Sequence, residues 1–336
     1  MSKPNGNINQ GMLDPPTLCA SPARRIDPGL ISRVQAFKAK RVTKAFILGA
    51  GLGNRLRPLT DRLPKPLVPL FHQPLAAWAI MACERAGIHR FAVNTHHLPL
   101  AWDGFGAGRD VTLFHEPVLL ETGGGLKNIG SWIGDDPLLV HNGDIFSTMP
   151  LEKLIAAHEA SGLPATLALR SEGTARHIAI DPSGSVVTDI RMLLGLADGT
   201  HVFSGIYCVN PGFLELIPSG EKISIIPAFL ELAKAGKLGA VVLDEGVWLD
   251  LGERDSYLQA HRDLSLAPAI HATATVEPGA VVAGSIIGPG AVIEAGAVVR
   301  DSVVWPGGRV KADAVLDRCI VFSDTPASGV HQNEDL

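Results

Sequence analysis

The sequence lacks the features that mark secreted, membrane-spanning or generally nucleic-acid-binding proteins. Its 336 residues include four cysteines, which are scattered and form no CxxC pair, so we expect reduced thiols and no disulfide framework or zinc site. No apolar run approaches the roughly 18 residues that crossing a bilayer requires. The formal net charge is −5, so cationic residues are expected to act locally. The cysteines are Cys19, Cys83, Cys208 and Cys319.

The first 42 residues also lack an apolar stretch of the signal-peptide type. They are polar and proline-rich, which predicts a flexible leader with one short helix over residues 29–40. Reduced thiols and the missing signal together predict a cytoplasmic protein with no membrane partner.

The rest of the chain has the composition of a folded protein, with 46% hydrophobic and 19% charged residues. From residue 43 to residue 265, β-rich runs alternate with helical patterns. This alternation predicts an α/β domain with a Rossmann-like, mostly parallel mixed sheet flanked by helices. Strands are expected over residues 44–48, 90–95, 111–115, 137–142, 165–170, 177–180, 203–210 and 246–252, and helices over 75–87, 151–161 and 226–236.

A different pattern follows, in which aliphatic residues recur in steps of 6, 6 and 5. The pattern repeats every 17 residues, so Ile270, Ile287, Val304 and Val321 fall in one column of a three-sided coil. It resembles the left-handed β-helix built from hexapeptide repeats. We expect this β-helix over residues 266–325, followed by a tail over 326–336.

The loop after the first expected strand reads GAGLGNRLRPLTDRLPKPLVPL, residues 49–70. The glycines at 49, 51 and 53 let the backbone approach a ligand, and successive N–H groups in such a turn can hold an anion. Arg55, Arg57 and Lys65 add donors suited to phosphate. The alternative interpretation is a tight turn with a solvated basic flank.

Two known phosphate-binding motifs do not fit this loop. Asn54 lies where a dinucleotide-binding fingerprint starting at Gly49 requires its third glycine, and no GxxxxGK[ST] motif occurs.

The loop is followed in order by EPVLLETGGG, HNGDIF, FSGIYCVNP and WLDLG. Together these motifs resemble the sugar 1-phosphate nucleotidylyltransferases, also called nucleotide-sugar pyrophosphorylases, over residues 44–264. LETGGG and NGDI are most similar to N-acetylmuramate 1-phosphate uridylyltransferase. The combination with a C-terminal β-helix is similar to several mannose 1-phosphate guanylyltransferases.

The resemblance implies that a sugar 1-phosphate attacks the α-phosphorus of a nucleoside triphosphate and releases pyrophosphate. It assigns Arg55 to the β/γ-phosphates and Lys65 to the α-phosphate or the sugar phosphate. Asp144 and Asp250 match the family's magnesium ligands, and Mg²⁺ is the expected cofactor. Arg55, Lys65 and Asp144 are thus the candidate catalytic residues.

The resemblance also implies which residues contact the nucleoside and the sugar. Glu116 lies where the family often reads the base, because a carboxylate accepts N–H donors from guanine or uracil. Asn142, Ser204 and Gly205 are candidate sugar contacts. The remaining candidate nucleotide contacts are Gly49, Ala50, Gly51, Gly53, Glu121, Thr122, Gly123 and Gly124.

Some features depart from the family pattern. The lysine that many relatives carry in the sugar-binding half is missing from residues 165–177. Lys222 is the candidate to replace it as the second phosphate-binding cation. His96 and His97 are adjacent, so on a strand they point to opposite faces and a shared metal ion is not expected. His141 is expected to serve packing.

Two other functions are compatible with this plan. The β-helix could add an acyltransferase, although only His271 lies among its expected repeats. The chain could instead be a regulatory subunit that binds an NDP-sugar without turnover. Assembly into a homo-oligomer through the β-helix is expected in each case. The base and the sugar stay open. The candidate pairs are GTP with mannose 1-phosphate or a heptose 1-phosphate, and UTP with an N-acetylmuramate or N-acetylhexosamine 1-phosphate.

Overall fold

The structure, a computed structural model, describes residues 40–336. The predicted leader over residues 1–42 and the short helix over 29–40 therefore lie almost entirely outside the described residues. Within the described part, none of the helices combines the length and hydrophobicity that crossing a membrane requires. Cys83, Cys208 and Cys319 are buried and form no disulfide.

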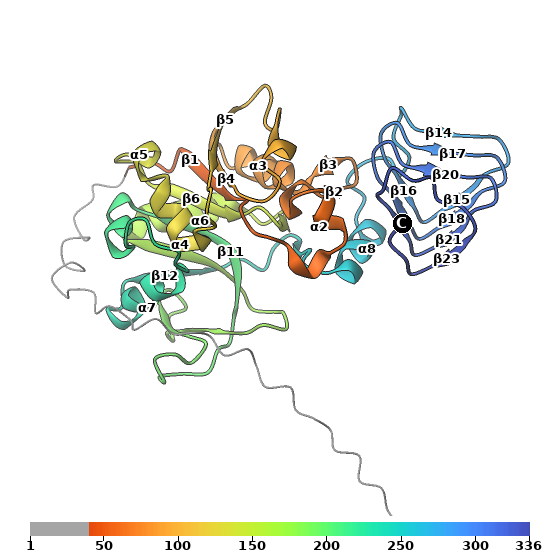
Figure 1. The fold of residues 1–336 in the computed structure, drawn as a ribbon. Coiled ribbons are helices and arrows are strands. Elements are labelled where there is room, and N and C mark those ends of the chain that lie inside the picture. The colour runs from red at the N-terminus through yellow and green to blue at the C-terminus, as the bar shows by residue number, and fades with distance from the viewer. Residues whose placement is uncertain (1–39) are drawn as a thin grey trace, which may run out of the picture.

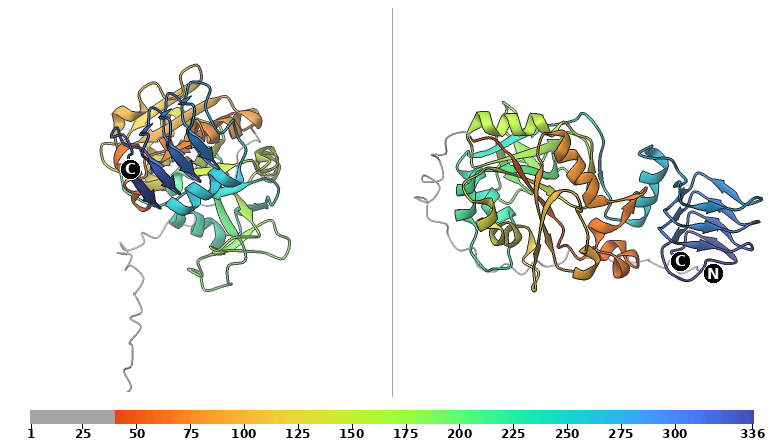
Figure 2. Two further views of the ribbon diagram at one scale, coloured as in Figure 1. Left: turned by 90° about the vertical axis from the view of Figure 1, so that its right-hand side faces the viewer. Right: turned by 90° about the horizontal axis from the view of Figure 1, so that it is seen from above.

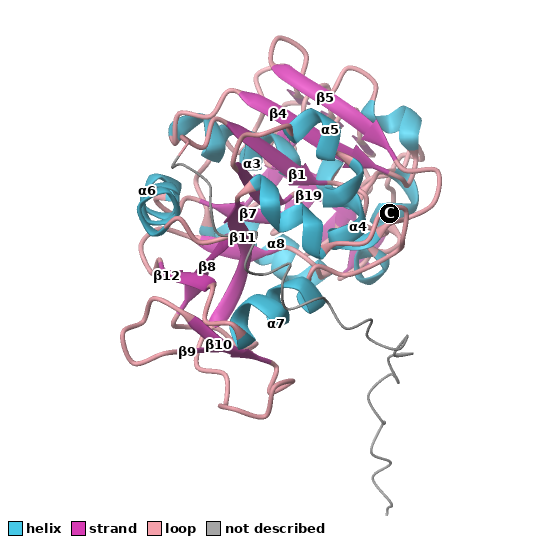
Figure 3. Ribbon diagram, turned by 90° about the vertical axis from the view of Figure 1, so that its left-hand side faces the viewer, coloured by secondary structure: helices cyan, strands magenta, loops and turns pink. Residues whose placement is uncertain are grey.

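A seven-stranded sheet lies at the centre of the α/β part, in the order β12-β8-β11-β6-β1-β4-β5 (Figure 3). Only β11 runs antiparallel to its neighbours, β6 and β8, so the predicted mostly parallel mixed sheet is confirmed. The interior strand β1 carries the run KAFIL with no exposed residue, as a strand covered on both faces requires. The strands are β1 (Lys44–Leu48), β4 (Arg90–Thr95), β5 (Asp110–His115), β6 (Leu138–Asn142), β8 (Ala165–Arg170), β11 (Val202–Val209) and β12 (Leu238–Val242).

Helices cover both faces of this sheet and form two hydrophobic cores (Figure 1). Helices α3 (Leu75–Arg85) and α6 (Leu151–Ser161) contribute to one core. Helices α4 (Glu121–Asn128), α5 (Gly130–Ile133) and α7 (Ile226–Lys234) contribute to the other.

Two of these helices and one further helix lie where no helix was predicted. Helix α4 includes three consecutive glycines and therefore has a low intrinsic propensity, and the four-residue α5 is too short to leave a periodic signal. Helix α8 (Arg254–Asp263) is mostly polar and begins with a capping box between Glu253 and Ser256. Its stability comes from a narrow buried face, and so few apolar residues leave only a weak helical pattern in the sequence.

Short elements connect the main layers. Neither α2 nor the pairs β2–β3 and β9–β10 were predicted as units from the sequence. The elements are α2 (Leu59–Arg62), β2 (Pro69–Leu70), β3 (Gln73–Pro74), β7 (Ile145–Ser147), β9 (Ile178–Ile180), β10 (Val187–Ile190) and β13 (Trp248–Asp250), with 3-10 turns at Asn54–Leu56, Lys65–Leu67, Pro99–Trp102 and Pro211–Leu216.

The C-terminal part is a left-handed parallel β-helix with three sheets. It faces the viewer in the left panel of Figure 2, and its stacked coils are visible in the right panel. Val304 pairs with both Ile287 and Val321, which confirms the 17-residue column expected from the sequence. Its strands are β14 (Thr275–Val276), β15 (Val281–Ala283), β16 (Ile286–Ile287), β17 (Val292–Ile293), β18 (Val298–Arg300), β19 (Val303–Val304), β20 (Arg309–Val310), β21 (Val315–Asp317), β22 (Ile320–Val321) and β23 (Val330–Gln332).

The β-helix continues beyond residue 325, where a tail was expected from the sequence. Strand β23 pairs in parallel with β21, and Ala327 and Asp335 form bridges to the preceding coil. This last coil was missed because residues 322–329 are mostly small or polar and break the aliphatic spacing. The coil also contains a second histidine, His331.

The sheet β16-β19-β22 packs against the α/β part (Figure 1). Its outward residues Ile286, Val303 and Ile320 share one hydrophobic cluster with Leu56 and Leu59 of the glycine-rich loop.

Polar contacts reinforce this junction. The Tyr257 hydroxyl donates to the Pro69 carbonyl (2.6 Å) and accepts from Trp305 Nε1 (3.0 Å). Arg62 pairs with Asp324. The glycine-rich loop is therefore anchored to the β-helix by both apolar and polar contacts.

Candidate active site

Three residues lie in one row at, or one residue before, the ends of neighbouring strands at the carboxyl edge of the sheet. Leu48 of β1 is in register with Asn94 of β4 and with Asn142 of β6. All three line the same pocket. The residues that follow β1 and β6 therefore lie near each other, as expected for the carboxyl ends of neighbouring parallel strands.

The glycine-rich loop leaves β1 at this edge, and its glycines have different local requirements. Gly53 alone of the three has a left-handed φ, 65°, and a Cβ there would lie 2.8 Å from Thr60 Cγ2. A Cβ on Gly49 would lie 2.6 Å from the Asn94 carbonyl oxygen, so Gly49 permits close packing and not an unusual φ. Gly51 faces open space and lines the pocket.

Lys65 lies at the centre of a cluster of opposite charge. Its Nζ is 2.6 Å from Asp144 Oδ2 and 3.5 Å from Asp250 Oδ1, while only 7% of its side chain is exposed. Asp144 follows β6 and Asp250 ends β13, so two separate strands bring their carboxylates to one ammonium group. Both carboxylates are partly exposed, at 33% and 46%, and a ligand can therefore reach them.

Arg55 extends into the same region from the glycine-rich loop. Its guanidinium forms an exposed ion pair with Glu253 (3.1 Å). A Cβ on Gly252 would lie 2.9 Å from Arg55 Nη2 and 3.0 Å from Asp250 Oδ1, so the guanidinium lies close to the lysine–aspartate cluster. Arg57 instead pairs with Asp61 on α2.

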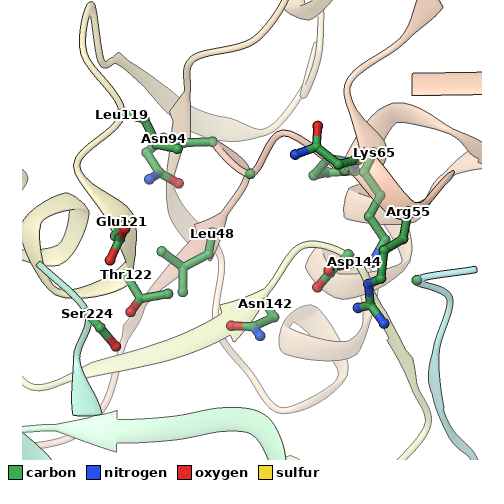
Figure 4. A pocket seen from close by; sticks show the side chains of 16 residues that line it. Leu48, Arg55, Lys65, Asn94, Leu119, Glu121, Thr122, Asn142, Asp144 and Ser224 are labelled. Carbon is green, nitrogen blue, oxygen red and sulfur yellow. Dashed lines mark hydrogen bonds and ion pairs between the residues drawn. The ribbon is translucent and has the colours of Figure 1, made fainter. Parts of the chain in front are cut away.

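Arg55, Lys65 and Asp144 are among the residues that line a pocket of about 500 Å³, which is large enough for a small organic ligand. Figure 4 shows that its two ends differ in charge. Arg55, Lys65 and Asp144 lie together at one end, and Leu119, Asn94, Glu121, Thr122 and Ser224 lie at the other, with Asn142 between them.

Glu116 is placed differently from what was expected from the sequence. It is fully buried, with Oε1 accepting from Asn94 Nδ2 (2.7 Å) and Oε2 accepting from the Leu120 N–H (2.9 Å). It does not line the pocket. The expectation of direct contact with a base is therefore corrected, because both oxygens already have partners within the fold.

The segment ETGGG forms the first turns of α4 and not a loop that closes over a ligand. Cβ atoms on Gly123 and Gly124 would lie 2.9 and 2.4 Å from carbonyl oxygens of residues 223 and 221. These glycines therefore allow the chain before α7 to pack on α4. Glu121 has a left-handed φ of 61° and lines the pocket, as does Thr122, whose Oγ1 accepts from the Ile225 N–H.

Of the three candidate sugar contacts, only Asn142 lines the pocket. The Ser204 hydroxyl is fully buried and donates to the Ala168 carbonyl (2.7 Å) within the irregular part of β11. Gly205 has a φ of 76°, and a Cβ there would lie 2.7 Å from Asn142 Nδ2. Gly205 therefore packs directly against Asn142, and the Ser204 hydroxyl is used within the sheet. Neither residue lines the pocket, which corrects the expectation that they contact the sugar directly.

The histidines near the pocket bond to the backbone. The ring nitrogens of His96 and His97 lie 2.7 and 2.8 Å from the carbonyls of Glu116 and Thr60. His141 Nδ1 donates to the Asn142 carbonyl, and burial lowers the pKa of this imidazole to about 4. Over residues 40–336, no group of three or more His, Cys, Asp or Glu side chains could hold a metal ion by itself.

Lys222 lies at the rim of the pocket, 3.7 Å from Glu121 Oε1, and both side chains are well exposed. Several residues around the pocket were missed from the sequence, among them Asn94, Leu119, Ser224 and Glu253. Asn94 could have been found, because it lies one residue before the end of an expected strand at the ligand-binding edge. The other three carry no comparable signal.

Comparisons with known proteins agree with this geometry. Residues 44–266 match the nucleotidyl transferase family, and residues 259–327 match the family described as GlmU-like, C-terminal hexapeptide. The mannose-1-phosphate guanylyltransferase of Mycobacterium tuberculosis is 28% identical, over 74% of this chain and 75% of its own length. The N-acetylmuramate alpha-1-phosphate uridylyltransferase of Neisseria meningitidis is also 28% identical, over 62% of this chain and 93% of its own.

A solved structure shares the fold of the α/β part. UDP-glucose pyrophosphorylase from Acinetobacter baumannii superimposes with a TM-score of 0.58 at 19% identity, over 65% of this chain and 92% of its own. The family match covers most of the chain and includes the loop, the Asn-Gly-Asp turn and the strand that ends at Asp250. The chain therefore belongs to the nucleotidyl transferase family, in its sugar 1-phosphate branch, and is an enzyme of that class with a C-terminal hexapeptide β-helix.

Proposed function

We propose that the pocket joins a nucleoside triphosphate and a sugar 1-phosphate to give an NDP-sugar and pyrophosphate. The observation that carries this proposal is the position of Lys65 between Asp144 and Asp250 at the charged end of the pocket. A site for two polyanions requires cations that offset their repulsion, and the cluster supplies a buried ammonium beside the exposed guanidinium of Arg55.

The transfer itself requires few chemical groups from the protein. A phosphate oxygen of the sugar 1-phosphate forms a bond to the α-phosphorus, and the bond from this phosphorus to the leaving pyrophosphate oxygen breaks. The attacking phosphate is already ionised at neutral pH, so no side chain has to remove a proton. Arg55 and Lys65 hold the phosphates in line and stabilise the charge that develops on the oxygens.

The donor set of the charged end fits Mg²⁺. Two aspartates from different strands present oxygens near one cation and are partly exposed, and they are the two carboxylates expected from the sequence. One or two carboxylates plus phosphate oxygens and water is the ligand set that Mg²⁺ prefers in nucleotide sites. When bound, Mg²⁺ would neutralise charge on the phosphate oxygens.

The end of the pocket opposite Lys65 is proposed to hold the nucleoside. Ala50, Gly51 and Gly53 present loop backbone to the pocket, and Thr122 and Ser224 offer polar groups from the opposite wall.

The sugar is proposed to lie between the two ends. Asn142 lies there and is the proposed sugar contact. Lys222 lies at the rim beside Glu121 and is a candidate second cation for the sugar phosphate.

A screen of pyrophosphate release tests the function and identifies the substrates. The four common NTPs are combined with mannose, N-acetylglucosamine, N-acetylmuramate and heptose 1-phosphates in the presence of Mg²⁺. We expect steady release for GTP with mannose 1-phosphate or for UTP with an N-acetylated sugar. Tight binding of an NDP-sugar without release from any pair would instead identify a sensor and contradict the proposal.

We also propose that the β-helix joins two copies of this chain through the sheet β15-β18-β21-β23. Val281, Val298, Val315 and Val330 pair in register across this sheet and form an outward column, in which Val281 is 46% and Val330 is 78% exposed.

The neighbouring column of this sheet includes Arg300 and Asp317, which pair with each other in register. A two-fold axis between their strands would place Arg300 of each copy opposite Asp317 of the other, which favours a second copy as the occupant. Light scattering should show a dimer for the wild type and a monomer for Val298→Asp. A monomeric wild type, or a variant that stays dimeric, would contradict this interface.

A further inference from the structure

A buried pair of polar side chains, Asn94 and Glu116, joins the two walls of the pocket at the end opposite Lys65. Asn94 is 2% exposed, and Glu116 is fully buried. Asn94 Oδ1 accepts from the Gly49 N–H (2.7 Å), while Asn94 Nδ2 donates to Glu116 Oε1 (2.7 Å). Glu116 Oε2 accepts from the Leu120 N–H (2.9 Å). The chain of bonds therefore runs from the glycine-rich loop to the start of α4.

Two backbone donors set the direction of these bonds. The Gly49 and Leu120 N–H groups can only donate, so the Asn94 amide turns its oxygen toward Gly49 and its nitrogen toward Glu116, whose two oxygens both accept. Among residues 40–336, no lysine, arginine or histidine forms an ion pair with Glu116, which leaves neutral N–H donors to satisfy the buried carboxyl group. Such a carboxylate is held firmly, because losing a donor would be costly.

The packing around the pair leaves no room for another arrangement. A Cβ on Gly125 of α4 would lie 2.8 Å from both Asn94 Nδ2 and Glu116 Oε1. The segments that the pair connects include the pocket residues Ala50 and Leu119. A change in the pair would therefore move both walls at once.

We propose that Asn94 and Glu116 are positioning residues for the nucleoside triphosphate. Glu116 orients the Asn94 amide, Asn94 holds the first residue of the glycine-rich loop, and Glu116 also holds the residue before α4. The two walls that enclose the nucleoside are thereby kept at a fixed separation. This inference rests on the proposed function, and it replaces direct reading of a base by Glu116 with an indirect role.

The arrangement allows a test in which the two groups exchange their roles. Asn94→Asp alone would place two carboxyl groups in contact. Glu116→Gln alone would turn its amide nitrogen toward another N–H donor, at either Asn94 or Leu120, so one hydrogen bond would be lost. In the double variant, the new amide at position 116 could donate to the new carboxylate at position 94 and accept from the Leu120 N–H. That carboxylate would also accept from the Gly49 N–H. Every bond is then restored, with the carboxyl and amide groups exchanged between the two positions.

We expect each single variant to raise the KM for the NTP about tenfold or more, with little change in the KM for the sugar phosphate. The double variant should recover to within about threefold of the wild type, because the buried bonds are complete again. Dissociation constants for GTP and UTP should follow the same order. Thr166→Val is the matched control: it breaks a buried bond to His158 (2.9 Å) elsewhere and should lower the melting temperature without changing the KM for the NTP.

A double variant that melts like the wild type but is no better than the worse single variant would overturn the inference. Single variants with an unchanged KM for the NTP would overturn it as well. Failure of the proposed function has a different signature, in which the wild type releases no pyrophosphate from any substrate pair. NTP binding still tests the inference in that case, and a wild type that binds no NTP would overturn both.

Discussion

Replacing Lys65 by methionine should weaken catalysis and strengthen binding of a divalent ion, and these opposite effects follow from one geometry. The Lys65 ammonium lies 2.6 Å from Asp144 and 3.5 Å from Asp250, so it offsets the negative charge that a metal ion would require. Methionine has a similar length and no charge, and it can fill the buried path of the side chain. The variant therefore leaves the two carboxylates without their cation.

The size of the effect depends on how well solvent screens the carboxylates. Two unit charges about 4 Å apart interact by roughly 4 kcal/mol at an effective dielectric constant of about 20. The side chains of Asp144 and Asp250 are 33% and 46% exposed, which reduces this value. We expect a gain of about 1–3 kcal/mol for the ion, or about 5- to 150-fold in Kd. Loss of the phosphate contact should lower kcat/KM by about a hundredfold or more.

Calorimetric titration with Mn²⁺ in the absence of nucleotide measures the first effect, and pyrophosphate release measures the second. Lys153→Met is the matched control, since Lys153 forms an exposed ion pair with Glu245 outside the pocket and should change neither quantity. If Lys65→Met bound Mn²⁺ no more tightly than the wild type and kept its kcat/KM, the electrostatic account of this cluster would be refuted.

Two further predictions concern stability. Gly53→Ala should destabilise the protein by about 1–3 kcal/mol in urea unfolding, because φ is 65° and the added Cβ would contact Thr60 and Lys65, whereas Gly51→Ala should cost far less. Equal losses for the two variants would contradict the strain at Gly53. Burial lowers the pKa of His261 to about 4, while its ring accepts from the Phe71 N–H. The unfolded chain then binds the proton more readily, so stability should be fully present above about pH 6.5 and fall by about 2 kcal/mol toward pH 5. His261→Gln should remove that part of the pH dependence, and an unchanged slope would show that His261 does not carry it.

Features that depend on local pattern could be predicted from the sequence. The run KAFIL, the alternation that follows it and the 17-residue period each specify one repeated geometry, and the structure has the corresponding sheet and β-helix. Lys65, Asp144 and Asp250 also come together, although they lie far apart in the chain. Asp144 follows β6 and Lys65 lies in the loop after β1, near one edge of the main sheet. Asp250 is brought beside them because β13 pairs with β7, which directly follows Asp144.

Features that depend on a specific tertiary partner could not be predicted. The position of Glu116 in a motif does not reveal that Asn94 and the Leu120 N–H use both of its oxygens. Ser204 likewise loses its hydroxyl to the Ala168 carbonyl because β11 is irregular at that point. The helix at residues 121–128 forms despite three glycines, since only glycine lets the chain before α7 pack this closely.

The most direct test of the central claim is the rate of pyrophosphate release by the wild type and by Asp144→Asn across a Mg²⁺ titration. This substitution removes a charge at the shared edge of the sheet while keeping the shape of the side chain. The account predicts a wild-type rate that rises to a plateau with Mg²⁺ and a nearly inactive variant with an unchanged melting temperature. A variant that matched the wild-type rate at every Mg²⁺ concentration would contradict it.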